Sequence, residues 1–395
     1  MMKASNILFF IYDSNFPMKI AKIEVYLVRI PLQNPFRFAD TLLSEMDTVI
    51  VRMDDQEGRS GWGEVFPGNL PILTAAWSSG VFYALKDCIL PMLGTNVSID
   101  SGNHLLEQLQ KIQGNRHAKA VLDMAFWDLY SKQLGKPLHE AIGGKRQEIE
   151  LGLVFDRYED INPFMDDLKR AVAEGYKRIS LKIRPGWDLS MLRIVRAELP
   201  MVMLQCDLEG ALSMEQHSEM LYRFDDFFPA LLEQPLSASE YVGHAMLQDG
   251  MRTHIGLDES ITTLHQAHIA FDLQSGSTFC LKPGKVGGLT EAIRINDACF
   301  ASDIACYSGF DCGTSIAYRF TAALASLSRF TLPADYLRME EILTVDPGVP
   351  LASELAEDDD AKSRRVCRLW AEPGIGFEPN RELIEKHAIQ RFSPQ

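Results

Sequence analysis

The chain has 395 residues, of which 46% are hydrophobic, and it carries a formal net charge of −15 at pH 7. That length suits two domains, and the apolar fraction allows a sizeable core. Nucleic acids and anionic membranes are bound by basic surfaces, so we expect neither as a partner.

The cysteines and the apolar runs bear on the location of the protein. The seven cysteines include no C-x-x-C pair and no zinc-like spacing, which is typical of reduced thiols. No stretch reaches the roughly 18 apolar residues of a membrane span, and the apolar run from Ile7 to Tyr12 lacks a following cleavage site. We therefore expect a cytoplasmic protein and interpret residues 1–17 as an N-terminal extension.

Residues 18–145 begin with strands and continue with helices. The runs KIEVYLVRIPL and DTVIVRMDDQEGRSGWGEV have the character of antiparallel strands. Apolar residues then recur at helical spacing from about residue 72 to residue 135, where Gly135 and Pro137 end the pattern. This region is predicted to be an α+β domain.

From residue 149 the pattern changes to short apolar runs, such as RISLKI and TFCLKP, each followed by an amphipathic helical stretch. Repeated β-then-α units predict parallel strands, and seven or more such units favour an α/β barrel of the TIM type over residues 146–350. In the C-terminal segment, residues 351–395, the run AEPGIGF is expected to return toward the first domain.

Charged residues stand at the ends of successive barrel strands, 23 to 26 residues apart. They are Lys182 with Arg184, Asp207, Glu233, Asp258 and Lys282. Strand ends converge on one face of a barrel, where active sites are built. Three carboxylates crowded together there need a cation, and Mg²⁺ fits better than Zn²⁺ because no His or Cys joins the set. We therefore predict that the three carboxylates are Mg²⁺ ligands.

These parts predict a reaction on a small carboxylate substrate. A base would remove the proton α to the carboxylate, and the metal would stabilise the enediolate intermediate. A lysine beside a divalent cation has a lowered pKa and can serve as that base.

Several motifs resemble the enolase superfamily, muconate-lactonizing subgroup, most closely its o-succinylbenzoate synthase / N-acylamino acid racemase branch. The resemblance runs from Met18 to about Phe377 and rests on MKIAKIEVYLVRIPL, GWGEVFPG, AFWDLYSKQLGKPL, LKIRPGWD, LLEQPL, GLDES and LKPGKVGGLTEA. It implies an α+β capping domain over a (β/α)₇β barrel. It also implies that Asp207, Glu233 and Asp258 ligate Mg²⁺ and that Lys282 is the strand-six lysine.

The resemblance further implies that two stretches of the capping domain shape substrate specificity. They lie near Phe36–Leu43 and Phe66–Asn69, so Phe36 and Phe66 are expected to contact the substrate. Family members are often homo-oligomers, which the acidic charge does not exclude.

The chain departs from the branch at three places. The Lys-x-Lys of strand two reads Lys182-Ile183-Arg184, and arginine is a poor base. The Asp-x-Asn of strand three ends in Glu209, and the acidic residue of the strand-seven loop is lost or moved to Asp311. We hypothesise that Arg184 pairs with Glu209, because the two changes cancel in charge. Glu209 and Asp311 are then candidate substrate-binding residues.

A one-base reaction agrees best with this set. We expect a synthase-like elimination of water, with Lys282 or Lys182 as the base and Arg184 holding charge. The alternatives are racemisation or cycloisomerisation of the same branch, and a catalytically altered homologue that retains the metal. An acid-sugar dehydratase agrees less well, because strand seven offers no His.

Overall fold

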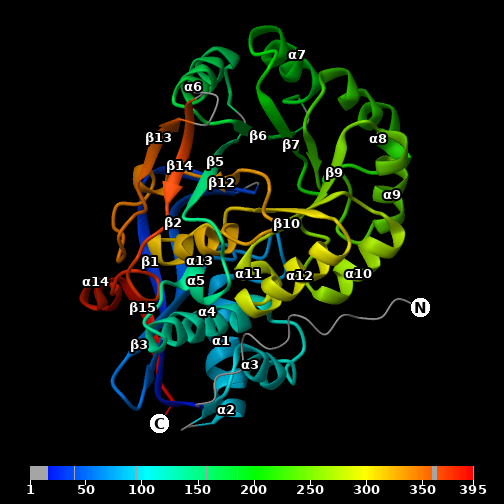
Figure 1. Ribbon diagram of the computed structural model, residues 1–395. Coiled ribbons are helices and arrows are strands. Elements are labelled where there is room, and N and C mark those ends of the chain that lie inside the picture. Colours follow the sequence, from blue (N-terminus) through cyan, green and yellow to red (C-terminus); the bar gives the residue numbers. More distant parts are fainter. Residues whose placement is uncertain are drawn as a thin grey trace.

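A computed structural model describes residues 17–39, 41–94, 97–156, 158–184, 186–357 and 363–394. It contains an N-terminal sheet covered by helices and a barrel ringed by helices (Figure 1). Residues 1–16 of the expected N-terminal extension lie outside the described residues.

The N-terminal sheet is antiparallel. Its strands follow the order β15-β1-β2-β3, with β4 pairing to β1. Their bounds are Met18–Phe38 for β1, Thr41–Asp55 for β2, Ser60–Val65 for β3, Ser98–Ile99 for β4 and Ala388–Phe392 for β15. The long β1–β2 hairpin pairs Val25 with Val51 and, near its tip, Phe36 with Leu43. The Phe36–Leu43 stretch is therefore the end of a hairpin.

Helices cover this sheet. They are α1 (Ser78–Ala84), a π-helical turn (Leu85–Ile89), α2 (Leu90–Leu93), α3 (Gly102–Leu109), α4 (Arg116–Gln133) and α5 (Leu138–Ala141). Helix α4 is buried from Ala118 to Ser131, as expected for a helix packed on several sides. Glycines let it lie close to β3, since a Cβ at Gly61 would be 2.2 Å from the Ala125 carbonyl oxygen.

The barrel strands pair in parallel along the chain. They are β5 (Glu148–Phe155), β6 (Arg178–Lys182), β7 (Met203–Asp207), β8 (Leu231–Glu233), β9 (His254–Leu257), β10 (Thr278–Leu281), β11 (Ala305–Ser308) and β12 (Ala334–Tyr336). The ring closes because β12 pairs with β5 and a bridge joins Cys306 to Phe330.

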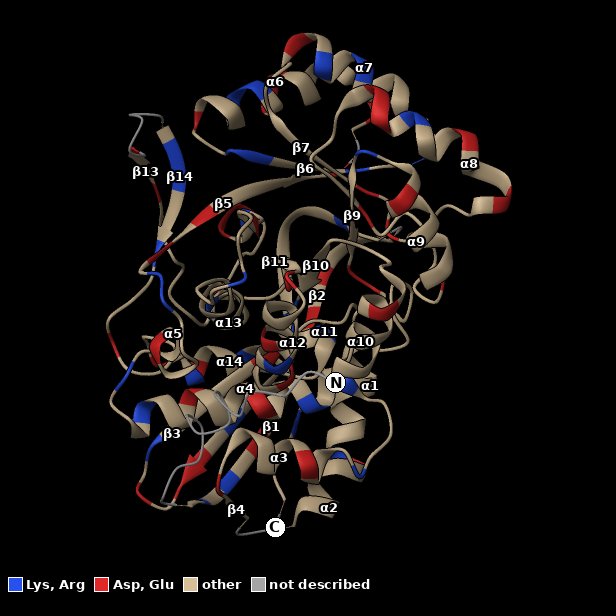
Figure 2. Cartoon of the chain, turned by 45° about the vertical axis from the view of Figure 1, so that its right-hand side comes forward, with Lys and Arg blue, Asp and Glu red and all other residues tan. Residues whose placement is uncertain are grey.

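Helices connect successive parallel strands of the barrel, as crossover connections require. They are α6 (Ile161–Ala173), α7 (Leu189–Glu198), α8 (Met214–Tyr222), α9 (Tyr241–Gly250), α10 (Leu264–Leu273), α12 (Leu289–Ala301) and α13 (Ser315–Ala325), with a short α11 (Pro283–Val286) before α12. The expected (β/α)₇β fold with an α+β capping domain is confirmed. Figure 2 shows charges of both signs along the outer helices α6 and α7, whereas the charged residues of α8 are acidic. No helix within the described ranges has both the length and the apolar character needed to cross a membrane.

The C-terminal segment contacts both parts of the molecule. Strand β14 (Ser363–Arg368) pairs with β13 (Ser353–Glu357) and, on its other side, with barrel strand β5. Helix α14 (Arg381–His387) and β15 then follow, and β15 forms the edge of the capping sheet. The segment therefore extends the barrel sheet before it reaches the capping domain.

Three buried carboxylates of the capping sheet and α4 bind backbone N–H groups of later segments. Glu64 accepts from Thr314 N at 3.0 Å, and Asp123 accepts from Thr290 N at 3.1 Å, both at helix N-termini, where unpaired N–H groups favour an anion. Asp128 accepts from Ile375 N at 2.7 Å. The first two bonds hold the capping domain against the barrel, and the third holds it against the C-terminal segment.

Candidate active site

One pocket lies between the tip of the β1–β2 hairpin and the carboxyl ends of the barrel strands. It is lined by Phe36, Arg37, Phe38, Ala39, Leu73, Val154, Asp156, Ser180, Lys182, Arg184, Asp207, Glu209, Glu233, Glu259, Lys282, Phe310, Cys312, Asp335 and Leu337. Side chains alternate along a strand, and so Ser180, Lys182 and Arg184 share one face. That face looks into the pocket, whereas Ile179 and Ile183 are buried in the apolar core.

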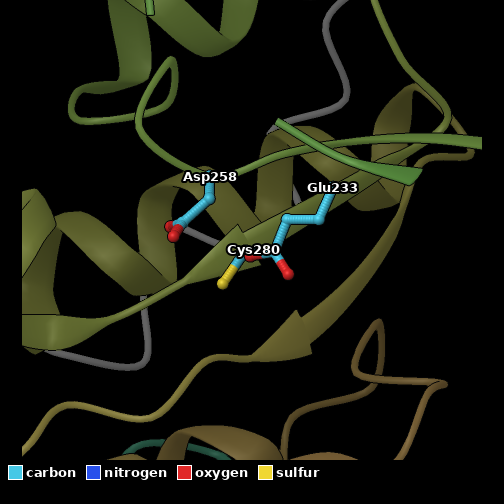
Figure 3. A group of neighbouring side chains, drawn as sticks. All are labelled: Glu233, Asp258 and Cys280. Atoms are coloured by element: carbon cyan, nitrogen blue, oxygen red, sulfur yellow. The ribbon is translucent and has the colours of Figure 1, made fainter. Parts of the chain in front are cut away.

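Two of the expected metal ligands meet in the barrel interior. Ligand atoms of Glu233, Asp258 and Cys280 all lie within 4.8 Å of one another, and Figure 3 shows the three side chains converging from β8, β10 and the end of β9. Asp207, at the end of β7, lines the same pocket, where its Oδ1 accepts from Glu209 N at 3.0 Å. The cysteine was not expected in this set.

The crowding of Glu233 with other buried acidic groups shifts its pKa and favours a cation bound by oxygen ligands. Burial, followed by the charges of Asp207 and Asp258, raises the pKa of Glu233 well above its usual range. Burial also raises the pKa of the Cys280 thiol, and sulfur is a softer ligand than the oxygen donors that Mg²⁺ prefers. Crowded carboxylates of this kind are relieved by a hard divalent cation.

Glu259 adds a further carboxylate that the sequence analysis missed. Its Oε2 is buried without a hydrogen-bond partner, and the side chain lines the pocket. Burial and the neighbouring Asp258 raise its pKa to about 8. The residues present thus fit a divalent cation such as Mg²⁺. The only sequence signal for Glu259 is its place next to Asp258 in GLDES.

Asp258 is held by two lysines. Lys282 Nζ lies 2.6 Å from Asp258 Oδ2, and Lys285 Nζ contacts Oδ1 and also donates to Cys280 O at 3.0 Å. Burial would raise the pKa of Asp258, but the two lysines lower it below its usual range. Lys285 was missed by the sequence analysis, because only the short α11 turn brings it back beside Asp258.

Gly309 makes room for the Lys282 side chain. A Cβ at this position would lie 2.3 Å from Lys282 Cε and 2.4 Å from Cys280 Sγ. Such distances cannot be accommodated without moving the lysine, so the glycine after β11 is required for the observed course of Lys282 across the barrel.

The hypothesised pair of Arg184 and Glu209 is present. Arg184 Nη2 contacts Glu209 Oε2, and Glu209 Oε1 lies 2.6 Å from Lys182 Nζ. Lys182 Nζ also lies 2.5 Å from Asp207 Oδ2. Burial would raise the pKa of Glu209, but Lys182 and Arg184 lower it to about 2. Glu209 is therefore ionised and balances the guanidinium charge.

The backbone at Glu209 is unusual, with a φ of 46°. This left-handed conformation costs an ordinary residue roughly 1–2 kcal/mol, whereas asparagine adopts it more easily. The asparagine that the resemblance implies at this position would adopt this backbone conformation more easily. The contacts of Glu209 with Lys182 and Arg184 offset the cost in this chain.

Two expected substrate-binding residues lie outside the pocket lining. Phe66 is buried, and its ring packs edge-on against Phe38 with centroids 5.0 Å apart, so Phe38 lines the pocket in its place. Asp311 Oδ2 accepts from Gly284 N at 2.7 Å and thereby holds the turn after Lys282. Phe36 does line the pocket.

The two pocket lysines approach from opposite sides. Strands β6 and β10 are separated by β7, β8 and β9, half of the way around the ring. Burial would lower the pKa of both Lys182 and Lys282, but the surrounding carboxylates raise both well above the usual range. Among protein groups alone, both lysines are protonated, in contrast to the lowered pKa expected beside a cation.

Comparison with known proteins agrees with this architecture. The N-terminal domain of mandelate racemase / muconate lactonizing enzymes matches residues 21–143, and the enolase C-terminal domain-like family matches residues 164–383. The o-succinylbenzoate synthase of Bacillus subtilis (strain 168) is 33% identical over 376 residues, which cover 94% of this chain and 98% of that protein.

Two further relatives extend the comparison. The N-succinylamino acid racemase of Thermus thermophilus is 33% identical over 319 residues, 80% of this chain and 85% of that protein. A solved structure of an enolase superfamily member from Enterococcus faecalis V583 is 28% identical, with a TM-score of 0.84 over 96% of this chain and 100% of that chain.

The fold and the matched families define an enzyme of the enolase superfamily, in which divalent-metal dependence is general. The chain belongs to its mandelate racemase / muconate lactonizing enzyme family, and its curated relatives include o-succinylbenzoate synthases and N-succinylamino acid racemases. The family expected from the sequence is confirmed.

Proposed function

We propose that the protein removes the proton α to the carboxylate of a small substrate and completes an o-succinylbenzoate synthase-like elimination of water. The observation that carries this proposal is the pair of lysines, Lys182 and Lys282, on opposite sides of a buried carboxylate group in one pocket. The sequence identity of 33% to an o-succinylbenzoate synthase, over 94% of this chain, supports the choice of reaction.

Asp207, Glu233 and Asp258 would hold Mg²⁺ in this proposal. When bound, the cation would neutralise these carboxylates and stabilise negative charge that develops on the substrate carboxylate. Every ligand is a carboxylate oxygen, which is the donor type that Mg²⁺ prefers.

Lys282 is assigned as the base because of its partners. Its Nζ contacts Asp258, which is itself a proposed metal ligand, whereas Lys182 also contacts Glu209, which is not. Lys182 therefore keeps an anionic partner that favours its ammonium form. Lys282 would take the α-proton and return a proton to the leaving hydroxyl, so that water departs as the double bond forms.

Arg184 and Lys182 would present positive charges to the substrate from the side of the pocket opposite Lys282. Arginine stays protonated in proteins, and the carboxylate of Glu209 fixes its position. Both groups would then stabilise the anionic substrate without exchanging a proton with its α-carbon.

A racemase of N-acylamino acids is the second candidate, because Lys182 lies on the side opposite Lys282. Racemisation needs both lysines to exchange protons with the α-carbon. Elimination by a single base needs only one of them, and this difference separates the two candidates.

The test is proton NMR in D₂O with Mg²⁺, using the cyclohexadiene precursor of o-succinylbenzoate and both enantiomers of N-succinyl amino acids. We expect turnover of the precursor, and α-proton exchange from one enantiomer of the N-succinyl amino acids without interconversion of the enantiomers. EDTA should abolish both the turnover and the exchange. Interconversion of the enantiomers would favour the racemase. No exchange with any substrate would overturn the proposed chemistry.

Two variants assign the base. Lys282→Ala should reduce exchange by about 10²–10⁴-fold, the usual contribution of a general base. Lys182→Ala should weaken substrate binding and retain measurable exchange. The opposite order of effects would transfer the role of base to Lys182.

A further inference from the structure

Polar side chains fill part of the barrel interior next to the pocket. Arg178, Gln205, Tyr307 and Asp335 are all buried there, in a position that branched apolar residues usually fill in this type of barrel. Buried polar groups are costly unless they are paired. Their pairing leads directly to Glu233.

Gln205 connects Arg178 to Glu233. Arg178 Nη1 donates to Gln205 Oε1, and Gln205 Nε2 donates to Glu233 Oε2. A guanidinium can only donate and a carboxylate can only accept, so the orientation of the Gln205 amide between them is set by chemistry. The amide therefore presents its donor to Glu233 in a single orientation.

Arg178 is itself held on several sides. Its Nη2 donates to Asp335 Oδ1 and to Pro333 O, both at 2.6 Å, and its guanidinium lies 4.8 Å from the centre of the Tyr307 ring. Gly152 on the neighbouring strand leaves space for it, since a Cβ there would lie 2.9 Å from Arg178 Nε. A planar cation with so many fixed neighbours has little freedom to move.

We propose that Arg178 and Gln205 are positioning residues that orient Glu233 and thereby set the affinity of the site for a divalent cation. This inference rests on the proposed function, in which Glu233 is a metal ligand. Hydrogen bonds to a ligating carboxylate fix its orientation, and their loss typically lowers metal affinity by about 10–100-fold.

The test measures Mn²⁺ binding to the full-length metal-free chain by electron paramagnetic resonance, which does not depend on substrate or activity. Gln205→Met removes the donor to Glu233 at nearly constant size and should weaken Mn²⁺ binding by about 10–100-fold. Gln205→Asn keeps the amide but shortens it, should fold as the parent does, and is expected to show a smaller loss.

Arg178→Met should reproduce the loss, and Arg146→Met is its matched control. Arg146 donates to the carbonyl oxygens of Ala325 and Leu327, away from Glu233, so Mn²⁺ affinity should stay at the parent value. Arg178→Met could fail to fold because Asp335 loses its cation. In that case the Mn²⁺ affinities of the two Gln205 variants decide whether the positioning role holds.

The outcomes separate the two proposals. Parent affinity in folded Gln205→Met and Gln205→Asn would overturn the positioning role while leaving the metal site intact. Absence of Mn²⁺ binding by the parent chain would overturn the metal site in the proposed function, and the positioning role with it. A lower melting temperature with unchanged Mn²⁺ affinity would show that Gln205 serves stability alone.

Discussion

Arg184, just after β6, and Glu209, just after β7, form an ion pair at the edge of the pocket. Both positions differ from the usual residues of the branch that this chain resembles, and their charges cancel. The pair is nearly buried, with 11% and 13% of the two side chains exposed. Removal of one partner therefore leaves an uncompensated charge in a poorly solvated place.

A double-mutant cycle tests whether these residues act together. Glu209→Asn removes the anion beside the guanidinium, and Arg184→Lys keeps the charge but loses the planar fork that contacts Glu209. Each should lower the free energy of unfolding, and the double variant should be less affected than the sum of the two. We expect a coupling energy of about 0.5–3 kcal/mol, measured by urea unfolding and by kcat/KM. Additive effects would show that the two residues act independently.

The buried Glu64 carboxylate should give the stability of the protein a pH dependence. Burial raises its pKa from the ordinary value of 4.5 to about 7, despite hydrogen bonds from Thr314 and Thr48. Because the folded-state pKa is raised, protonated Glu64 contributes to the free energy of unfolding. This contribution is complete below about pH 4.5 and is lost as pH rises through about 7. It amounts to about 3 kcal/mol at about 1.36 kcal/mol per pH unit.

Glu64→Gln provides the measurement. The variant lacks this titration, so the difference in unfolding free energy between the parent and Glu64→Gln should shrink as pH rises from 5 to 8. Asp123, whose pKa is also raised to about 7 by burial, is present in both proteins and cancels in the comparison. A difference that stays constant over this range would contradict the raised pKa of Glu64.

Gly309→Ala should damage catalysis without unfolding the barrel. The added methyl group would lie 2.3 Å from Lys282 Cε and would push the proposed base aside. Misplacement of a catalytic group by about 1 Å can cost about 10²-fold in rate. Circular dichroism and the melting temperature serve as controls for folding, and parental α-proton exchange in the variant would argue against Lys282 as the base.

Mg²⁺ should stabilise the folded chain, because a cation that binds only the folded state adds its binding energy to stability. At 100 times the dissociation constant the gain is about 2.7 kcal/mol, which should raise the melting temperature by several degrees. EDTA should reverse the shift, and Asp258→Asn should abolish most of it. A shift of parental size in Asp258→Asn would remove Asp258 from the proposed ligands.

The sequence by itself determined the architecture of this protein. Apolar residues with the periods of strands and helices encode local structure, and the recurrence of β/α units leaves few ways to bury the strands other than a closed barrel. Charged residues spaced one unit apart at strand ends had to converge, which explains why Lys182, Asp207, Glu233 and Lys282 were identified as members of one pocket.

The sequence predicted the pair of Arg184 with Glu209, but only the tertiary structure decided the other pairings. Glu64 binds Thr314 across 250 residues of sequence, and Gln205 binds Glu233 across 28. Lys285 and Glu259 join the site through a short helical turn and a strand end, whereas Phe66 and Asp311 lie outside the pocket lining. Such contacts depend on side-chain direction and on packing between distant segments, which periodicity and spacing do not encode.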